Sequence, residues 1–378
     1  MGPAKSGFFV TRLDCTLNVA LFSKYSRLGA SSRLRSLQYL SALQQSGINV
    51  IANVLFDDDY LKRLYGEEER SLVYVARRYA QRARQMRWLK QADLIWLEYE
   101  ALPYVPHWLE KRLMPRGVPY VVDYDDAVFH RYDLSCSRLV RQLLGHKIDK
   151  VMANAALVIC GNDYLAERAR QAGARRIERV PTVVDASRYR VAPGDECQPS
   201  GITPVIGWIG SPSTQEYVLE LKPVLEAMHR QHAARLVLVG AQVQLAEQFD
   251  DLPVDVLPWS EETEALAIAS FDVGIMPLPD GPWERGKCGY KLIQYMAAGK
   301  AVVASPVGVN VEIVQGWQCG ELANDPTQWN DALSGLLMDP ARRRALGQRG
   351  RQAVEMHYSL QAQAPRLAGI LRSAARTG

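Results

Sequence analysis

The chain has 378 residues, 48% of them hydrophobic and 23% charged, and its formal net charge at pH 7 is +4. This length suffices for two domains with separate cores. The charge is too mild to indicate a nucleic-acid-binding protein, and we expect no nucleic-acid partner. The six cysteines include no Cys-x-x-Cys pair, which argues against a zinc site, a redox motif and a secreted disulfide framework.

The sequence shows neither a signal peptide nor an apolar run of the roughly 20 residues that a membrane-spanning helix needs. We therefore expect a cytoplasmic protein, and a peripheral position at the inner face of the membrane is the alternative. That alternative rests on residues 70–90, where seven basic residues and no acid accompany a helical stripe of apolar side chains. A helix that packs on the core with a solvated basic face explains the same pattern and is the interpretation we favour.

Short apolar runs alternate with helical patterns in the first half of the chain. The first helix is expected from Arg33 to about Gln45. Asp57, Asp58 and Asp59 are typical of an acid-rich helix start, and we prefer this interpretation to a metal site. The alternation predicts a parallel sheet with helices on both faces. The apolar runs predict strands at residues 17–22, 48–56, 94–97, 120–122 and 157–160.

The pattern restarts after a segment rich in proline and glycine, from Pro181 to about Thr203, which is the best candidate for a linker. We therefore expect an α/β protein of two Rossmann-like domains, residues 1–190 and 200–358, whose doubly wound parallel sheets face a central cleft. The segment from Asp339 onward has a helical pattern. In the second half, the apolar runs predict strands at residues 205–209, 236–239, 254–257, 273–276 and 301–304.

A strand, helix, strand unit lies between residues 271 and 316. Its helix is predicted from Tyr290 to Ala298, with Gly299 as the C-terminal cap. Lys287, Lys291 and Gln294 have spacings that place them on one face of this helix. Two ammonium groups beside the free amides of a helix start form an anion seat, the name used below for Lys287, Lys291 and these amides. A solvated basic turn on an ordinary amphipathic helix explains the spacing equally well.

The string K-x-x-x-K-L-I-Q-Y-M-A-A-G-K-A-V-V-A-S-P-V-G-V-N, which begins at Lys287, resembles the donor-binding signature of family-4-type glycosyltransferases of the GT-B fold. The resemblance implies a nucleotide-sugar donor whose diphosphate lies at the helix start and whose ribose is reached by Gln294. It also implies that the final helix, residues 359–378, crosses back onto the first half. The chain departs from the family at its Glu-x7-Glu pair, because Gly286 and Gln294 occupy the two positions.

Further donor-side candidates lie in loops after the strands. Ser213 and Thr214 can cap the next helix, whose free amides can take a phosphate oxygen. In the first half, Gly29 permits a tight turn, and Arg33 and Arg35 can meet the donor phosphate or an anionic acceptor. A capping serine with solvated arginines is the alternative, and it explains Arg35 equally well. Trp259 lies where relatives contact the nucleotide base, with a core position as the alternative. The full donor-side set is Gly29, Arg33, Gly210, Ser211, Ser213, Thr214, Trp259, Gly289, Tyr290, Lys291, Gln294, Gly308, Val309 and Asn310.

Acidic residues follow a strand of the first half. Asp125 and Asp126 can orient or deprotonate an acceptor hydroxyl, and turn-forming aspartates are the competing explanation. Together with Lys287, which would stabilise the leaving phosphate, they are the predicted catalytic residues. The acceptor-side candidates are Arg35, Glu98 and His130.

We expect a glycosyltransferase that moves a sugar from a nucleoside-diphosphate sugar to a glycan, a lipid-linked acceptor or a small molecule. Catalysis would be electrostatic, because cations and helix-end amides stabilise the departing nucleoside diphosphate, so we expect no metal and no cofactor besides this co-substrate. The resemblance suggests retention of the anomeric configuration. Two alternatives remain open: a nucleotide-sugar 2-epimerase of GT-B architecture, and a non-catalytic module that binds a nucleotide-sugar.

Overall fold

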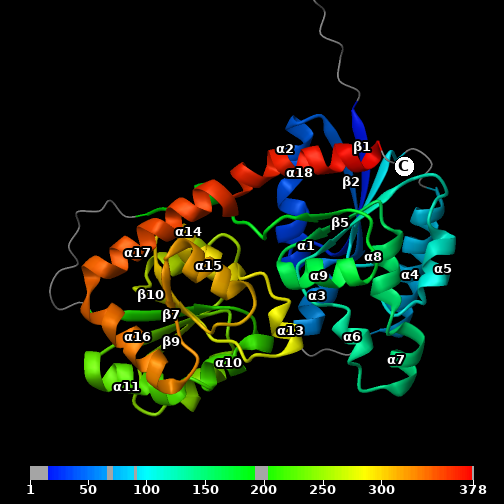
Figure 1. Ribbon diagram of the computed structural model, residues 1–378. Coiled ribbons are helices and arrows are strands. Elements are labelled where there is room, and N and C mark those ends of the chain that lie inside the picture. The colour runs from blue at the N-terminus through cyan, green and yellow to red at the C-terminus, as the bar shows by residue number, and fades with distance from the viewer. Residues whose placement is uncertain (1–15, 66–70, 89–91, 192–202, 377–378) are drawn as a thin grey trace, which may run out of the picture.

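The computed structural model describes residues 16–65, 71–88, 92–191 and 203–376. Two six-stranded sheets form the centres of two lobes (Figure 1), and their strand orders are β2-β1-β3-β4-β5-β6 and β12-β11-β10-β7-β8-β9. Every pairing within these sheets is parallel. The prediction of an α/β protein with two doubly wound parallel sheets is confirmed.

The strands carry mostly buried apolar side chains. The predicted strands all form, and the structure adds two three-residue edge strands, β6 and β12. In the first lobe they are β1 (Leu17–Tyr25), β2 (Ile48–Phe56), β3 (Leu94–Glu98), β4 (Tyr120–Tyr124), β5 (Leu157–Cys160) and β6 (Ile177–Arg179). In the second lobe they are β7 (Val205–Ile209), β8 (Arg235–Val239), β9 (Val254–Leu257), β10 (Val273–Met276), β11 (Ala301–Ala304) and β12 (Gly320–Leu322).

Helices cover both faces of each sheet (Figure 1). The first lobe contains α1 (Ala30–Arg35), α2 (Leu40–Gln45), α3 (Asp58–Tyr65), α4 (Leu72–Trp88), α5 (His107–Leu113), α6 (His130–Asp133), α7 (Arg138–Leu144), α8 (Lys147–Asn154) and α9 (Asp163–Gln171). The second contains α10 (Glu216–Leu219), α11 (Lys222–His232), α12 (Glu264–Ala269), α13 (Pro282–Arg285), α14 (Tyr290–Ala297), α15 (Val309–Trp317), α16 (Pro326–Met338) and α17 (Pro340–Ala353), and the chain ends with α18 (Leu360–Ala375). The short 3₁₀ helices are η1 (Leu37–Tyr39), η2 (Ala186–Arg188), η3 (Pro212–Thr214) and η4 (Val243–Gln248), and η5 (Val354–Tyr358) is a π-helix.

The prediction of one helix from Arg33 to Gln45 is wrong. The helical segment starts earlier, at Ala30, and it is interrupted at Ser36, whose φ of −134° lies outside the helical region. The Ser36 hydroxyl donates a hydrogen bond to the Ser32 carbonyl at 2.8 Å. Such a local side-chain bond competes with the regular helix, and three short pieces result.

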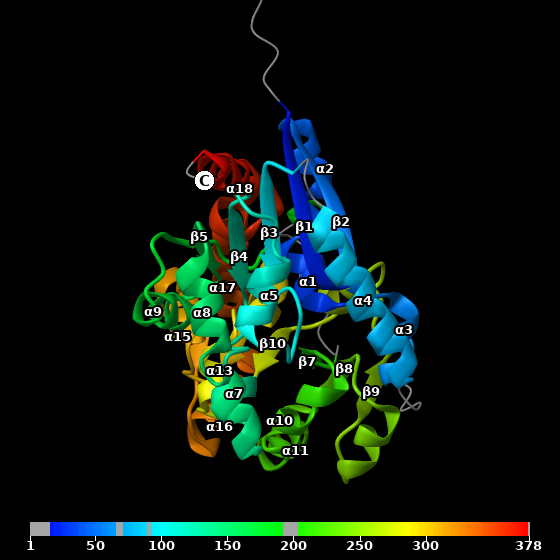
Figure 2. The same cartoon turned by 90° about the vertical axis from the view of Figure 1, so that its right-hand side faces the viewer.

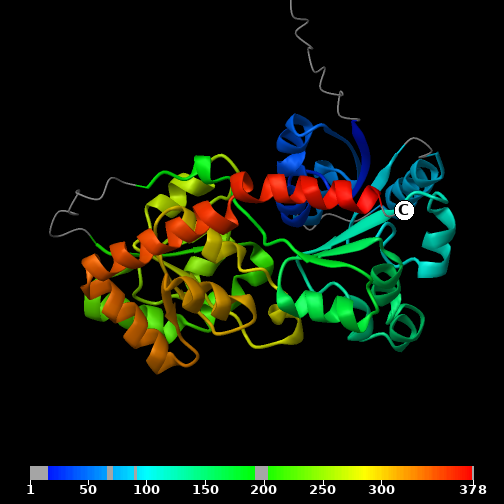
Figure 3. The same ribbon diagram turned by 45° about the horizontal axis from the view of Figure 1, so that its top comes forward.

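Two passages of the chain connect the lobes. On the first passage, Val183 packs in the core of the first lobe, whereas Val184 packs in the core of the second. On the second passage, Ser359 pairs with Val184 in a parallel bridge. After it, α18 lies across the first lobe (Figure 3), where Leu367 and Leu371 join the core under the sheet.

Within the basic stretch, residues 72–88 form α4, which packs along β2 (Figure 2), whereas residues 70, 89 and 90 lie outside the described residues. Arg82 is fully buried and donates to the carbonyls of Ser23 and Asn53 at 2.6 and 2.9 Å. Arg78 donates to the Leu55 carbonyl at 2.6 Å. Two arginines thus satisfy backbone carbonyls near the strand ends, as buried polar groups require. The other described arginines of α4 are exposed, and contact with a membrane stays a prediction.

No helix of the described residues combines the length and the apolar composition that crossing a bilayer requires.

Gly299 ends the site helix α14 as predicted. Its φ is +68°, its amide donates to Met296, and the Lys300 amide donates to Tyr295, both at 2.9 Å. This is the two-bond cap that glycine favours. Helix α17 contacts the cap through Gly347, where any Cβ atom would overlap the Gly299 carbonyl oxygen.

Replacing Gly347 with Ala should therefore destabilise the protein by about 1 to 3 kcal/mol, because the helices must separate to admit the methyl group. Gly369 in α18 is the matched control, since no atom lies within 4 Å of a Cβ placed there. Gly369→Ala should stabilise by about 0.5 to 1 kcal/mol through helix propensity. Denaturant unfolding measures both, and equal effects from the two substitutions would contradict the packing argument.

Candidate active site

The anion seat lies at the start of α14. Gly289 precedes the helix with a φ of +67°, and a Cβ atom there would lie 2.6 Å from Ile313. The Lys291 ammonium group lies over the ring of Trp208, 5.2 Å from its centroid. At Gly210, a Cβ atom would overlap this ring and lie 3.0 Å from Lys291. Gly210 therefore leaves room for the Trp208 ring and the Lys291 side chain, and Gly289 permits the left-handed turn that begins α14.

The segment before α14 is held against the first lobe. The Asn162 side-chain amide donates to the carbonyls of Gly286 and Lys287, both at 2.9 Å. The Cys288 thiol donates to the Asp125 carbonyl at 3.1 Å. A Cβ atom on Gly286 would lie 2.5 Å from Ala127. These contacts bring the two lobes together at the seat.

Asn162 was not singled out from the sequence. Its side-chain oxygen accepts from Leu165 and caps α9, a role that its position before a helix indicates. The remaining amide group bonds to a segment 124 residues away, which no local pattern reveals.

A carboxylate, Asp126, lies beside the two lysines of the seat. Burial raises the pKa of Asp126 to about 6, although the charge of Lys287 opposes this shift. Burial, and to a lesser extent the charge of Lys287, lowers the pKa of Lys291 to about 7. The charge of Asp126 partly offsets this decrease. Asp125 accepts a hydrogen bond from the Tyr99 hydroxyl. The predicted catalytic residues therefore lie together, and an anion bound here would relieve the repulsion between the lysines.

A polar cluster surrounds Gln294, which is buried. Its amide nitrogen donates to Glu264 at 3.1 Å and to the Tyr189 hydroxyl at 3.3 Å. The Trp259 indole nitrogen donates to the same Glu264 carboxylate at 2.9 Å. The guanidinium of Arg33, from the first lobe, lies 4.7 Å from the centroid of the Trp259 ring. Trp259, Gln294 and Arg33 are thus brought together, and Glu264 is a member that the sequence did not reveal.

Two acceptor-side candidates are fully engaged by protein groups. Arg35 is buried and donates to Asp123 at 2.7 and 3.0 Å and to the Val180 carbonyl at 2.8 Å. His130 has Asp133 at one ring nitrogen and Tyr164 at the other, each at 2.8 Å. These contacts favour a structural role for both residues.

Glu98 differs from these two because one of its oxygens is unused. Its Oε2 accepts from the Ser32 hydroxyl at 2.6 Å and the Lys24 amide at 3.0 Å. Oε1 is buried without a partner among the described residues. Burial raises the pKa of Glu98 to about 7.

The remaining donor-side candidates form loops around the seat. Gly29 closes a tight turn, because its amide donates to the Ser26 carbonyl at 3.0 Å. Its φ of −72° is ordinary, and the missing side chain permits close approach to Tyr25. The Asn310 side chain donates to the Ser305 carbonyl at 3.1 Å. Gly308, with a φ of +55°, lies before Val309, the first residue of α15.

The prediction that Ser213 and Thr214 cap the next helix is wrong. The short helix η3 intervenes before α10, Ser213 bonds to Ser211 at 2.9 Å, and the Thr214 hydroxyl donates to the Ser211 carbonyl at 3.2 Å. Tyr290 occupies the first position of α14.

In the described part of the chain, no group of three or more His, Cys, Asp or Glu side chains is placed to hold a metal ion.

Residues 203–339 match the family model described as Glycosyl transferases group 1. These residues, which run from β7 through α16 of the second lobe, form a glycosyl transferases group 1 domain. This group 1 domain contains the whole anion seat, Glu264 and every donor-side candidate except Gly29 and Arg33. No curated protein matches the chain in sequence.

Solved structures resemble the whole chain. Sucrose-phosphate synthase from Thermosynechococcus elongatus has a TM-score of 0.70 at 17% identity, with 96% of this chain and 100% of that chain covered. HepE from Anabaena in complex with UDP and glucose has a TM-score of 0.69 at 16% identity, covering 94% and 100%. Trehalose 6-phosphate synthase from Burkholderia multivorans has a TM-score of 0.63 at 17% identity, covering 95% and 99%. The predicted GT-B fold is confirmed, and with the group 1 domain so is the prediction of a glycosyltransferase.

The pKa of Lys291 leads to a prediction about proton uptake. With a pKa of about 7, Lys291 is mostly neutral at about pH 8, and a bound diphosphate favours its charged form. Binding of a nucleoside-diphosphate sugar, whose diphosphate does not titrate in this range, should therefore make Lys291 take up roughly half to one proton at about pH 8 and almost none at about pH 6. Affinity should fall as the pH rises.

Calorimetry in two buffers of different ionisation enthalpy measures this uptake. Lys291→Arg keeps the positive charge at every pH tested, so this variant should bind without proton uptake. Undiminished uptake in Lys291→Arg would assign the proton to another group.

Proposed function

We propose that the chain transfers a sugar from a nucleoside-diphosphate sugar to a hydroxyl acceptor, with retention of the anomeric configuration and without a metal ion. The observation that carries this proposal is the contact of the segment before α14 with the loop that holds Asp126, where Cys288 donates to the Asp125 carbonyl and Gly286 packs on Ala127. The charges of Lys287 and Lys291 act on Asp126 there. The bound UDP and glucose of the structurally similar HepE support a nucleotide-sugar as the donor.

The donor diphosphate would lie in the anion seat. Free amides at the start of α14 and two ammonium groups present positive charge to it, and both are arranged before the ligand arrives. Negative charge grows on the departing phosphate oxygen as its bond to the anomeric carbon breaks. Preorganised positive groups stabilise that charge more in the transition state than in the bound donor, which accelerates the step.

The acceptor hydroxyl would approach from the first lobe, and Asp126 would orient it. Its oxygen forms the new bond to the anomeric carbon, and its proton passes to the departing diphosphate on the same face of the sugar. In this arrangement Asp126 holds the hydroxyl by accepting its hydrogen bond. The positive charge of Lys287 would then stabilise both the Asp126 carboxylate and the departing phosphate oxygen.

One observation favours a second candidate, a non-catalytic module that binds a nucleotide-sugar. Gly286 and Gln294 stand where the resembling family has its glutamate pair, so neither position supplies a carboxylate. Such a module would bind a nucleoside diphosphate without releasing a sugar. A nucleotide-sugar 2-epimerase differs from both, since it would convert the donor with no acceptor.

A panel of nucleotide-sugars, each with and without acceptors, should show release of nucleoside diphosphate that depends on an acceptor. Lys287→Ala and Lys291→Ala should each lower kcat by about 100-fold, because each removes stabilisation of the leaving group. Lys222→Ala is the control, since Lys222 is paired with Asp250 at the surface. Unimpaired turnover in both seat variants would refute the phosphate assignment, and conversion of the donor alone would identify an epimerase.

Asp126 should impose a pH dependence on the reaction. Its pKa of about 6 means that the carboxylate accepts the hydroxyl hydrogen bond above this pH and loses the capacity below it. Wild-type kcat should fall on acidification through about pH 6, and Asp126→Asn should lower kcat by about 100-fold at neutral pH. If the residual activity of Asp126→Asn keeps the acidic limb near pH 6, another group causes it.

A further inference from the structure

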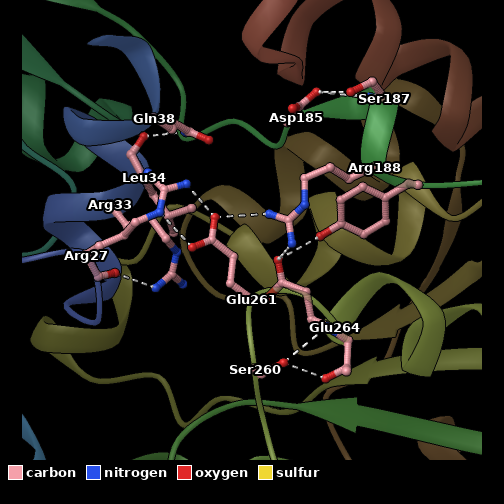
Figure 4. A network of polar contacts seen from close by, with 12 residues as sticks. Arg27, Arg33, Leu34, Gln38, Asp185, Ser187, Arg188, Ser260, Glu261 and Glu264 are labelled. Atoms are coloured by element: carbon pink, nitrogen blue, oxygen red, sulfur yellow. Dashed lines mark hydrogen bonds and ion pairs between the residues drawn. The ribbon is translucent and has the colours of Figure 1, made fainter. Parts of the chain in front are cut away.

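Glu264 is the central residue of a polar cluster that the mechanism above does not use. It begins α12, and its side chain is 2% exposed. Three neutral donors converge on its carboxylate: Trp259 at 2.9 Å, Gln294 at 3.1 Å and Tyr189 at 3.4 Å. The closest cation, Arg188, lies farther away at 3.6 Å and links Glu264 to Glu261 (Figure 4). A buried carboxylate held in this way needs every one of its donors.

The chemistry of this cluster decides how the Gln294 amide is turned. A carboxylate accepts hydrogen bonds and cannot donate one, so the NH2 group of Gln294 must face Glu264. The same nitrogen donates to the Tyr189 hydroxyl at 3.3 Å. The amide oxygen of Gln294 is therefore directed away from Glu264. Within the described residues, no hydrogen bond from the protein reaches that oxygen, which leaves it free to accept one from a ligand.

The resemblance implies that Gln294 reaches the ribose of the nucleotide, and the position of Gln294 along α14 agrees with this. Gln294 follows Lys291 by three residues on the same helix face, which corresponds to about 4.5 Å along the axis. A nucleoside diphosphate bound in the anion seat carries its ribose directly beside the phosphate. The free amide oxygen of Gln294 can accept a hydrogen bond from a hydroxyl group of this ribose.

We propose that Glu264 is a positioning residue for the ribose of the nucleotide: it fixes the Gln294 amide so that the amide oxygen accepts a ribose hydroxyl. The inference rests on the proposed function for the diphosphate position. In this subsite Glu264 carries the negative charge and Gln294 is the neutral partner. A carboxylate at both positions would place like charges about one hydrogen bond apart, which is unfavourable in a buried site.

Exchanging the two side chains tests this assignment. Gln294→Glu should weaken the binding of UDP, GDP or ADP, whichever the wild-type protein prefers, by about tenfold, because two carboxylates then share one hydrogen bond. Glu264→Gln should weaken it by a similar factor, since the amide of Gln294 is no longer held in one orientation. The double variant restores one carboxylate and one amide, and its affinity should return to within about threefold of wild type.

Glu262→Gln is the matched control, because Glu262 is exposed on the same loop. Affinity is measured by calorimetry and folding by the Tm of each variant. In turnover, each single variant should raise KM for the nucleotide-sugar by about the factor lost in binding and leave kcat within about threefold, as loss of uniform binding does. A purely structural role would instead lower Tm and kcat together.

Wild-type affinity in Gln294→Glu, or a double variant no better than the weaker single variant, would overturn the inference. The proposed function fails separately: a wild-type protein that binds the nucleotide but transfers no sugar refutes transfer, and rescue in the double variant still supports the pairing. A wild-type protein that binds none of the three nucleotides refutes both.

Discussion

The rest of the structure depends on holding two positive charges side by side where the lobes meet. Burial and mutual repulsion oppose the charged form of Lys291, and neither Lys287 nor Lys291 forms an ion pair within the part of the chain that the structure describes. Asp126 of the other lobe offsets the repulsion only in part. A doubly charged anion at the helix start is the ligand that satisfies both ammonium groups at once.

Both lobes contribute to this arrangement. The first lobe holds the segment before α14 through the Asn162 amide, and it supplies the carboxylate at Asp126. The second lobe supplies the lysines and, one turn farther along α14, the cluster around Glu264. The seat itself belongs to the second lobe, but Asp126 reaches it only when the lobes are together, so closure of the lobes completes the site. The polar residues of α14 are therefore positioned by loops that are distant in sequence.

Much of this fold could be predicted from the sequence, because strands such as Val273–Met276 are buried on both faces and appear as uninterrupted apolar runs. Strand β12 was missed since it has three residues and a polar one at its centre. The lysines of the site could be predicted from their spacing. Asn162 and Glu264 could not, because each looks like an ordinary residue at a helix start and its partner lies 124 or 30 residues away.

The parallel bridge between Val184 and Ser359 has a consequence for motion. The amide of Val184 donates to Tyr358 and the amide of Leu360 donates to Val184, so the two interlobe passages are fastened together at one point. Sliding of one lobe past the other would break both bonds, whereas rotation about an axis through this point preserves them. We expect a hinge at this bridge. The Asn162 contact with the segment before α14 would limit its opening, so a bound product would leave when the hinge opens.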